Sequence, residues 1–176
     1  MNYVRQEVKM PDSFSDFSKP QSLLTLLVCA AAAVLFAFVT GECWPRIQYA
    51  GDPLNFPMSA SVFYAFCLIA YLAQGAAFVL IARHPQKLTF DLGVMLFGAQ
   101  FVTGLLWLGV FFGLELFGTA LAVILVTLLL LFATFAAFKP INFKAACLLA
   151  PYGCLIAFAG FLNIWFFLGR QVFDAA

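Results

Sequence analysis

Hydrophobic residues dominate this chain in five long runs that short polar segments separate. No Asp, Glu, Lys, Arg or His interrupts any of the runs, and each reaches the ~20 residues that an α-helix needs to cross a bilayer. The runs predict transmembrane helices at residues 22–40, 57–82, 92–112, 119–138 and 145–168. The fold class is therefore an all-α integral membrane protein, a bundle of five transmembrane helices.

The polar segments divide the rest of the chain. Residues 1–21 form a polar N-terminal tail, residues 22–168 the membrane domain and residues 169–176 a C-terminal tail. The longest connection is a loop at 41–56, whose prolines and aromatic residues suit the membrane interface. The other connections are short, so consecutive helices pack antiparallel. The long loop is the one segment free to cover the mouth of a cavity.

Basic residues indicate the orientation in the membrane. With five spans, the N-terminal tail and the second and fourth connections share one side. That side holds Arg5, Lys9, Lys19, Arg83, Lys87, Lys139 and Lys144. The opposite side holds Arg46 and Arg170, so the positive-inside rule places the N-terminus in the cytoplasm. We expect a multi-pass protein of a bacterial cell membrane, with the first run retained as a helix because no signal-peptide cleavage site follows it.

Composition narrows the function. Hydrophobic residues make up 65% of the chain and charged residues 10%, and the net charge is +1, which indicates no nucleic-acid partner. The five cysteines form no C-x-x-C pair, and the single histidine, His84, lies in a polar connection. Neither a metal site nor a Cys/His nucleophile is indicated, and no paired carboxylates appear. We therefore expect a protein that is not an enzyme.

Aromatic, small and amide residues fall on single faces of three predicted helices. Their helical spacing defines three stripes: Tyr64, Tyr71, Gly75 and Phe78; Gln100, Gly104, Trp107 and Phe111; and Tyr152, Ala159 and Asn163. Two interpretations are open on this pattern alone. Either the amides hydrogen-bond across helix interfaces as packing glue, or the stripes converge on a pocket in which a large flat ligand stacks on the rings.

Two stretches resemble the sequence signature of the translocator protein family, also called the tryptophan-rich sensory protein or peripheral-type benzodiazepine receptor (TspO/MBR) family. "LLAPYGCLIAFAGFLN" matches a signature of the fifth helix through Leu148, Leu149, Pro151, Tyr152, Ala159, Leu162 and Asn163. "QFVTGLLWLGVFFGLELFGTALAV" matches the third and fourth helices through Gln100, Trp107, Phe111, Phe112, Gly113, Ala120 and Leu121. Tyr71 and Gly75 match a shorter motif of the second helix. The resemblance covers about residues 41–168.

The resemblance implies a function as well as a fold. Members of the family are five-helix bundles, usually dimeric, with a pocket open toward the first loop that binds porphyrins, such as protoporphyrin or haem, and other lipophilic molecules. We therefore expect a membrane receptor or sensor in tetrapyrrole-related or stress responses. It would be a homodimer in contact with membrane lipid and would require no cofactor, with porphyrin or haem bound as a ligand. The alternatives are a porphyrin-degrading or transporting membrane protein and a purely structural membrane subunit.

The resemblance also implies the ligand-binding residues. These are Trp107, Tyr152, Leu155, Ala159, Leu162 and Asn163, with Gln100 and Tyr71 in support and Trp44 as a lid in the first loop. The chain departs from the family at Gly104, where Asn is usual, and at Leu155, where Trp is usual. Ile164 and Leu168 replace the Tyr and Arg of the family's sterol-associated stretch. We expect a changed ligand preference and no sterol binding through that stretch.

Overall fold

The fold is built from helices throughout the part of the chain that the computed structural model describes, residues 19–49, 60–82 and 87–174. The helices are α1 (Lys19–Tyr49), α2 (Ala60–Ala82), α3 (Lys87–Leu108), α4 (Phe117–Phe138), α5 (Phe143–Cys147) and α6 (Ala150–Asp174). A π-helical turn, η2 (Gly109–Gly113), continues α3.

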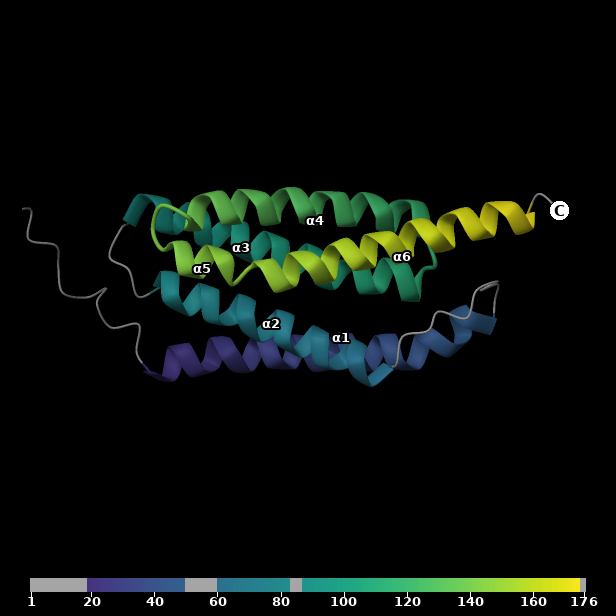
Figure 1. Ribbon diagram of the computed structural model, residues 1–176, viewed down its shortest axis with the longest axis horizontal. Coiled ribbons are helices and arrows are strands. Elements are labelled where there is room, and N and C mark those ends of the chain that lie inside the picture. Colours follow the sequence, from purple (N-terminus) through teal and green to yellow (C-terminus); the bar gives the residue numbers. More distant parts are fainter. Residues whose placement is uncertain (1–18, 50–59, 83–86, 175–176) are drawn as a thin grey trace, which may run out of the picture.

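Five segments are long and apolar enough to cross a membrane. They are Ser22–Gly41, Tyr64–Ala82, Leu92–Gly113, Phe117–Phe138 and Phe143–Leu168. This result confirms the five-helix membrane bundle that the hydrophobic runs predict, and the chain is an integral, multi-pass membrane protein. Figure 1 shows α1 beginning at one end of the bundle and α6 ending at the other, as an odd number of spans requires.

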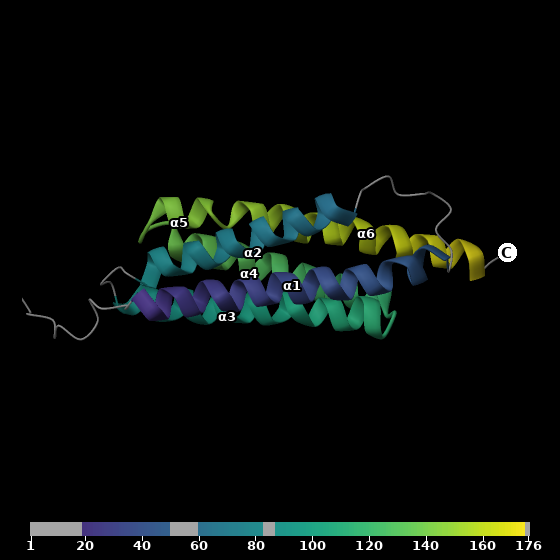
Figure 2. The ribbon, with the colours of Figure 1, turned by 90° about the horizontal axis from the view of Figure 1, so that it is seen from below.

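The helices pack as pairs that close into a ring. α1 packs along α2, α3 packs along α4, and α6 lies against both α4 and α2. A smaller contact between α1 and α3 completes the ring, whose order is α1, α2, α6, α4 and α3. Figures 1 and 2 show the helices running along the same long axis. The ring gives α2, α3 and α6 a common interior, although they lie far apart in the sequence.

A glycine sets the closeness of α1 and α2. A Cβ atom added at Gly75 of α2 would lie 2.9 Å from the Sγ atom and 3.1 Å from the Cβ atom of Cys29 on α1. Both distances are shorter than ordinary van der Waals contact, so a larger residue at position 75 would push the helices apart. Close approach through small residues is the usual means by which helices associate in a membrane.

Large apolar side chains cover the outer faces of the bundle. The most exposed of them, each with more than half of its surface accessible, include Leu23, Leu27, Val34, Phe38, Met95, Val102, Leu129 and Phe132. Contiguous apolar surface of this extent is rare on monomeric soluble proteins. Lipid acyl chains are the surroundings that suit these faces.

Two helices extend beyond their predicted ends. α1 continues to Tyr49, so the loop predicted at 41–56 is wrong for residues 41–49, and residues 50–56 lie outside the described part. Pro45 removes one backbone hydrogen bond and crowds the carbonyl group of the preceding turn, but membrane helices tolerate such a proline. α6 continues to Asp174, so the tail predicted at 169–176 is wrong as far as that residue. The polar residues there end the hydrophobic run without ending the helix.

The fifth predicted helix, residues 145–168, is interrupted. A short helix, α5, ends at Cys147, and α6 begins at Ala150 after a turn. Asn142 caps α5, because its side-chain oxygen accepts hydrogen bonds from the backbone N–H groups of Lys144 (3.0 Å) and Ala145 (3.3 Å). Pro151 fits the first turn of α6, where no backbone donor is needed. Asn142 therefore marks the start of α5, and Pro151 marks the start of α6 directly after the interruption at residues 148–149.

The two remaining long helices begin earlier than predicted. α3 begins at Lys87 rather than at residue 92, and α4 begins at Phe117 rather than at residue 119. The C-terminal ends of α2 and α4, at Ala82 and Phe138, agree with the prediction. The predicted start of the second helix at residue 57 lies outside the described residues.

Candidate functional site

The predicted stripe on α3 faces the interior of the bundle. Gln100 and Phe111 have no exposed surface, Trp107 is 2% exposed, and Gly104 is buried. The spacing of these residues follows the helical repeat, which places them above one another on one face. The exposed residues of α3, such as Val102 and Leu106, lie on the opposite face.

The predicted residues of α6 also face inward. Tyr152, Leu155, Ala159, Leu162 and Asn163 are each no more than 3% exposed. The exposed residues of the same helix, among them Phe161 and Ile164, alternate with them at helical spacing. The structure thus brings together the buried faces of α6 and α3. Leu155, which stands at the family's usual tryptophan position, is fully buried.

Tyr71 of α2 joins the two faces. Its ring is fully buried and meets the ring of Tyr152 edge to face, with centroids 5.5 Å apart. Phe36 of α1 lies 5.8 Å from Tyr71 and is stacked at 6.0 Å on Trp107. The rings of four helices therefore meet around one point in the interior. Trp44, the predicted lid, is part of α1, but its side chain lies outside the described part of the structure.

Gly104 makes room for the hydroxyl group of Tyr152. A Cβ atom added at Gly104 would overlap this hydroxyl oxygen, while the ring carbon Cζ would be 3.4 Å away, an ordinary contact. The absence of a side chain on α3 thus allows Tyr152 of α6 to reach the α3 backbone. An asparagine, the residue usual in the family, would not fit beside Tyr152 in this arrangement.

The π-helical turn η2 ends the aromatic interior at one end of α3. Its wider winding buries three consecutive residues, Val110, Phe111 and Phe112, where a regular α-helix would turn one of them outward. The ring of Phe111 lies 4.9 Å from Trp107 and 5.2 Å from Phe117 of α4. The turn therefore adds a second aromatic layer over Trp107. π-bulges of this kind occur frequently at functional sites.

Two amide side chains hold helices together, as the glue interpretation expects. Nδ2 of Asn163 donates a hydrogen bond of 3.0 Å to the backbone oxygen of Phe117 at the start of α4. Nε2 of Gln100 donates a hydrogen bond of 3.3 Å to Oε1 of Gln74 on α2. Each amide nevertheless uses only part of its hydrogen-bonding capacity in these contacts.

The interior contains six buried polar atoms without a hydrogen-bond partner among the described residues. They are the hydroxyl oxygens of Tyr71 and Tyr152, Nε2 of Gln74, Oε1 of Gln100, Nε1 of Trp107 and Oδ1 of Asn163. Each costs about 1–3 kcal/mol when it stays unpaired. All six belong to α2, α3 and α6, the three helices that carry the predicted stripes. This set, which we call the unpaired cluster, defines the candidate site.

Sequence reasoning missed two residues of the site. Gln74 lies in the charge-free run of α2, three residues after Tyr71, so the presence of an amide there was a usable signal. Phe36 gave no such signal, because α1 carries apolar residues on its inner and outer faces alike. Its place in the site depends on how α1 packs against α2 and α3.

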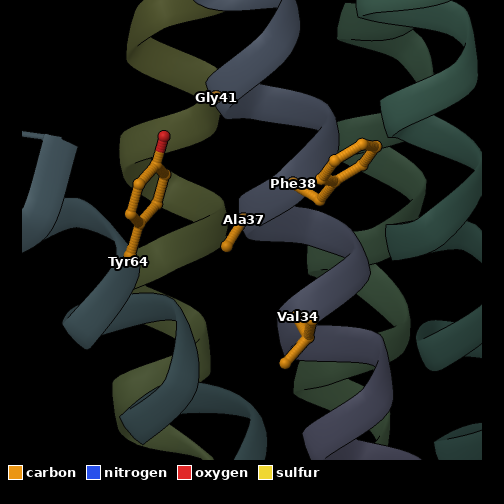
Figure 3. A pocket seen from close by; sticks show the side chains of 5 residues that line it. All are labelled: Val34, Ala37, Phe38, Gly41 and Tyr64. Atoms are coloured by element: carbon orange, nitrogen blue, oxygen red, sulfur yellow. The ribbon is translucent and has the colours of Figure 1, made fainter.

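A separate groove lies on the outer side of α1 and α2. It has a volume of about 420 Å³, is open to the surroundings and is lined by Val34, Ala37, Phe38, Gly41 and Tyr64. Figure 3 shows Tyr64 reaching from α2 alongside α1, with its hydroxyl group toward Gly41. Among the predicted ligand-binding residues whose side chains the structure describes, none lines this groove. Tyr64, from the stripe predicted on the second helix, therefore contributes to this surface, whereas Tyr71 of the same stripe belongs to the interior.

The interior can offer a ligand aromatic faces and uncharged hydrogen-bonding groups. Indole and phenol rings supply stacking surface, and the unpaired cluster supplies N–H and O–H donors together with carbonyl acceptors. Among the described residues, no group of three or more His, Cys, Asp or Glu side chains is arranged to hold a metal ion. The site is thus suited to recognition of a flat, largely apolar molecule with a polar edge.

The class that emerges is a five-helix membrane protein with an aromatic, polar-lined interior. A profile of the TspO/MBR family matches residues 24–168. The chain is also 30% identical over 153 residues to the tryptophan-rich protein TspO of Chlorobaculum tepidum, an alignment that covers 81% of this chain and 94% of the relative. The chain belongs to the TspO/MBR family. Membership supports a role as a membrane receptor or sensor in general.

Proposed function

We propose that this protein is a non-enzymatic membrane receptor that holds a flat lipophilic ligand among α2, α3 and α6. Porphyrins such as protoporphyrin, or haem, are the first ligands to test. The ligand would contact Trp107, Tyr71 and Tyr152 with its face and the amide groups with its edge. Leu155, Ala159 and Leu162 of α6 would supply the apolar wall.

The unpaired cluster is the observation that carries this proposal. More than nine-tenths of buried backbone polar groups, and the large majority of buried side-chain polar atoms, have a partner in native proteins, so six unpaired atoms in one membrane interior call for a reason. Asn163 and Gln100 already join helices through one hydrogen bond each, so the unpaired atoms are not needed for those two contacts. A ligand with its own donors and acceptors would satisfy the remaining groups.

The aromatic rings support the same proposal. The ring of Trp107 is stacked with that of Phe36 at 6.0 Å and with that of Phe111 at 4.9 Å. A porphyrin offers a larger flat surface of the same kind, and each aromatic pair adds about 0.5–1.5 kcal/mol beyond the burial of area. Ligand entry would replace ring contacts within the protein by ring contacts to the ligand. The ligand would enter from the side of the connection between α1 and α2, as the family resemblance implies.

Tryptophan fluorescence tests the proposal. The chain has three tryptophans, so a variant with Trp44→Phe and Trp165→Phe reports on Trp107 alone. This variant, in lipid nanodiscs, is titrated with protoporphyrin, and we expect quenching that saturates at a fixed ratio of ligand to protein. Nanodiscs without protein, to which free tryptophan has been added, serve as the control for non-specific quenching. If quenching of Trp107 rises linearly with porphyrin concentration, as in this control, the proposal is rejected.

A structural membrane subunit is the second candidate, because two of the buried amides do join helices. The bond from Asn163 to the Phe117 carbonyl ties α6 to the start of α4. On this alternative, Asn163→Leu lowers stability and no ligand response exists to be altered. The receptor and the structural subunit predict the same loss of stability in Asn163→Leu. Only the receptor predicts saturable quenching of Trp107 by protoporphyrin.

The orientation is part of the proposal. Figure 1 shows α5 at the end of the bundle where α1 begins. The exposed Lys144 belongs to α5, and the exposed Lys139 directly follows α4 in the connection to α5. Positive charge at that end favours a cytoplasmic N-terminus in a bacterial membrane. A reporter enzyme that is active only in the periplasm, fused after Ala176, should therefore be active. An inactive fusion combined with activity of an N-terminal fusion would reverse the orientation.

A further inference from the structure

The π-helical turn η2 holds in the interior a phenylalanine that an α-helix would turn away from it. Successive side chains of an α-helix point about 100° apart, so the stripe of Trp107 continues to Phe111 but not to Phe112. In the structure Phe112 is nevertheless buried, and its ring meets the ring of Trp107 edge to face at 5.8 Å. The wider winding of the π-turn therefore keeps Phe112 inside.

The backbone after η2 is held in an unusual conformation. The Leu114 N–H donates to the Gly109 oxygen five residues earlier at 3.0 Å, and the Leu116 N–H donates to the Val110 oxygen at 3.2 Å. Between these donors, Glu115 has a φ angle of 53°, in the left-handed region that residues other than glycine rarely adopt. If η2 rewound into an α-turn, one residue would pass into the connection to α4. That longer connection would not need Glu115 in the left-handed region.

Two glycines frame η2, and neither is needed for space. A Cβ atom added at Gly109 or Gly113 would meet nothing within 4 Å. Both residues belong to the right-handed π-helical turn, so no left-handed backbone requires a glycine there. What glycine supplies at these positions is backbone freedom. The open space at Gly109 also lies one turn before residue 112, where the ring of a rewound Phe112 would find room.

The position of η2 places these rings near one end of the interior. Figures 1 and 2 show α3 ending at the end of the bundle where α1 ends and α2 begins. η2 continues α3 there and packs against α1 and α4. The rings of Phe111 and Phe112 contact Trp107 at 4.9 Å and 5.8 Å. A molecule that enters the interior from this end would reach Trp107 past these two rings.

We propose that η2 is a hinge that rewinds between the observed π-turn and an α-turn, and that this motion swings the ring of Phe112 out of the interior and back. The π form closes the interior over Trp107, and the α form opens it. Phe111 keeps its place in both forms, because it lies on the helical stripe of Trp107. The motion belongs to the free protein, and its use as a gate for a ligand rests on the proposed function.

Fluorine NMR at position 112 tests the hinge without any ligand. Full-length protein in nanodiscs carries 4-trifluoromethylphenylalanine at this position. We expect relaxation dispersion from exchange between a major inward and a minor outward form, on the μs–ms timescale of collective helix motions. Gly109→Ala combined with Gly113→Ala should lower the exchange rate about tenfold, because each alanine removes backbone freedom.

Gly98→Ala is the matched control for the two alanine substitutions. Gly98 is also a glycine of α3 at which an added Cβ atom would meet nothing within 4 Å, but it lies outside η2. Its substitution should leave the exchange unchanged. Equal slowing by Gly98→Ala, or no exchange at position 112 in the parent protein, overturns the hinge. If the double alanine variant does not fold, the parent spectrum still decides.

The kinetics of ligand binding test the gate. The variant with Trp44→Phe and Trp165→Phe, in nanodiscs, is mixed rapidly with protoporphyrin, and the quenching of Trp107 is followed in time. A gate changes the association and dissociation rates by the same factor, since it lies on the entry path. The double alanine variant should therefore slow both rates about tenfold with Kd unchanged, and Phe112→Ala should accelerate both.

Two results contradict the gate. If the double alanine variant and Phe112→Ala change only the dissociation rate, the ring of Phe112 is part of the wall of the site and the gate is overturned. If protoporphyrin gives no saturable quenching, the proposed function and the gate fail together. The exchange at position 112 then still decides whether η2 is a hinge.

Discussion

Buried polar side chains are paired on α4 but partly unpaired on the inner faces of α2, α3 and α6. On α4, the hydroxyl groups of Thr127 and Thr134 each donate a 2.8 Å hydrogen bond to a carbonyl one turn earlier, Val123 and Leu130 respectively. On the other three helices, six buried polar atoms have no partner among the described residues. The bundle thus satisfies these buried threonines within their own helix, whereas it leaves part of the buried amide, phenol and indole groups without a partner among the described residues.

The threonines of α4 and the residues of the unpaired cluster are equally buried. Burial alone therefore does not explain why only the threonines have their polar atoms paired. A threonine hydroxyl that donates to a carbonyl of its own helix has no hydrogen left to donate to a neighbouring helix or a ligand. An unpaired amide, phenol or indole group keeps a directional bond available at a cost in stability. We interpret α4 as a structural wall and the unpaired cluster as a recognition surface, and the predictions below test this division.

The largest effect on stability is expected where the buried faces of α3 and α6 touch. Gly104→Ala places a methyl group against the hydroxyl oxygen of Tyr152 and should lower the free energy of unfolding by about 1–3 kcal/mol, the usual cost of overpacking. Unfolding in mixed micelles with increasing SDS measures this change. Adding Tyr152→Phe removes the clashing oxygen and should recover most of the loss. If the double variant stays as unstable as Gly104→Ala, the contact is not the cause.

Removal of an unpaired hydroxyl should stabilise the protein and weaken ligand binding. Tyr152→Phe keeps the ring contact with Tyr71 and relieves a buried unsatisfied group, so the ligand-free protein should gain about 1 kcal/mol. Porphyrin affinity should fall up to tenfold, which corresponds to about 1.4 kcal/mol. The same SDS unfolding series and the Trp107 titration measure the two quantities. A loss of stability with unchanged affinity would mean that the hydroxyl is structural.

A smaller effect is expected at Asn163, which combines both behaviours. Asn163→Leu removes the bond to the Phe117 carbonyl and should cost about 0.6 kcal/mol, the average measured for polar contacts between membrane helices. It also removes the unpaired Oδ1 atom, so the affinity for porphyrin should fall as well. Stability and affinity are measured on the same preparation. A fall in stability alone would favour the structural-subunit alternative.

The smallest effect is expected on α4. Thr134→Val removes a hydroxyl group that bonds only within its own helix, so stability should change by less than about 0.5 kcal/mol and porphyrin affinity should not change. Thermal unfolding and the Trp107 titration are sufficient to check this. A clear loss of affinity in this variant would erase the distinction between the structural wall and the recognition surface.

Much of the interior could be predicted from helical spacing. The stripe of Gln100, Trp107 and Phe111 is buried as the periodicity requires, and so are Tyr152 and Asn163. An amide in a transmembrane helix faces either lipid or the interior of the bundle. The interior is less costly, because the amide can find hydrogen-bond partners there. The direction in which each stripe faces was therefore accessible from the sequence.

The pairing of residues from different helices was not accessible in this way. Gln74 and Gln100 are 26 residues apart, and their contact depends on how α2 and α3 pack. Phe36 sits on a helix that is apolar on every side, so no pattern distinguishes its inner face. The continuation of α1 through Pro45 could not be predicted either, because a proline inside a helix usually kinks or breaks it.

The indole N–H signal of Trp107 tests the central claim most directly. Full-length protein labelled with ¹⁵N, in nanodiscs, gives three indole signals, and Trp107→Phe identifies the one that matters. Because Nε1 of Trp107 has no hydrogen-bond partner among the described residues, we predict that the signal moves downfield and saturates as protoporphyrin is added. Saturable ligand binding that leaves the Trp107 signal unchanged would contradict the account.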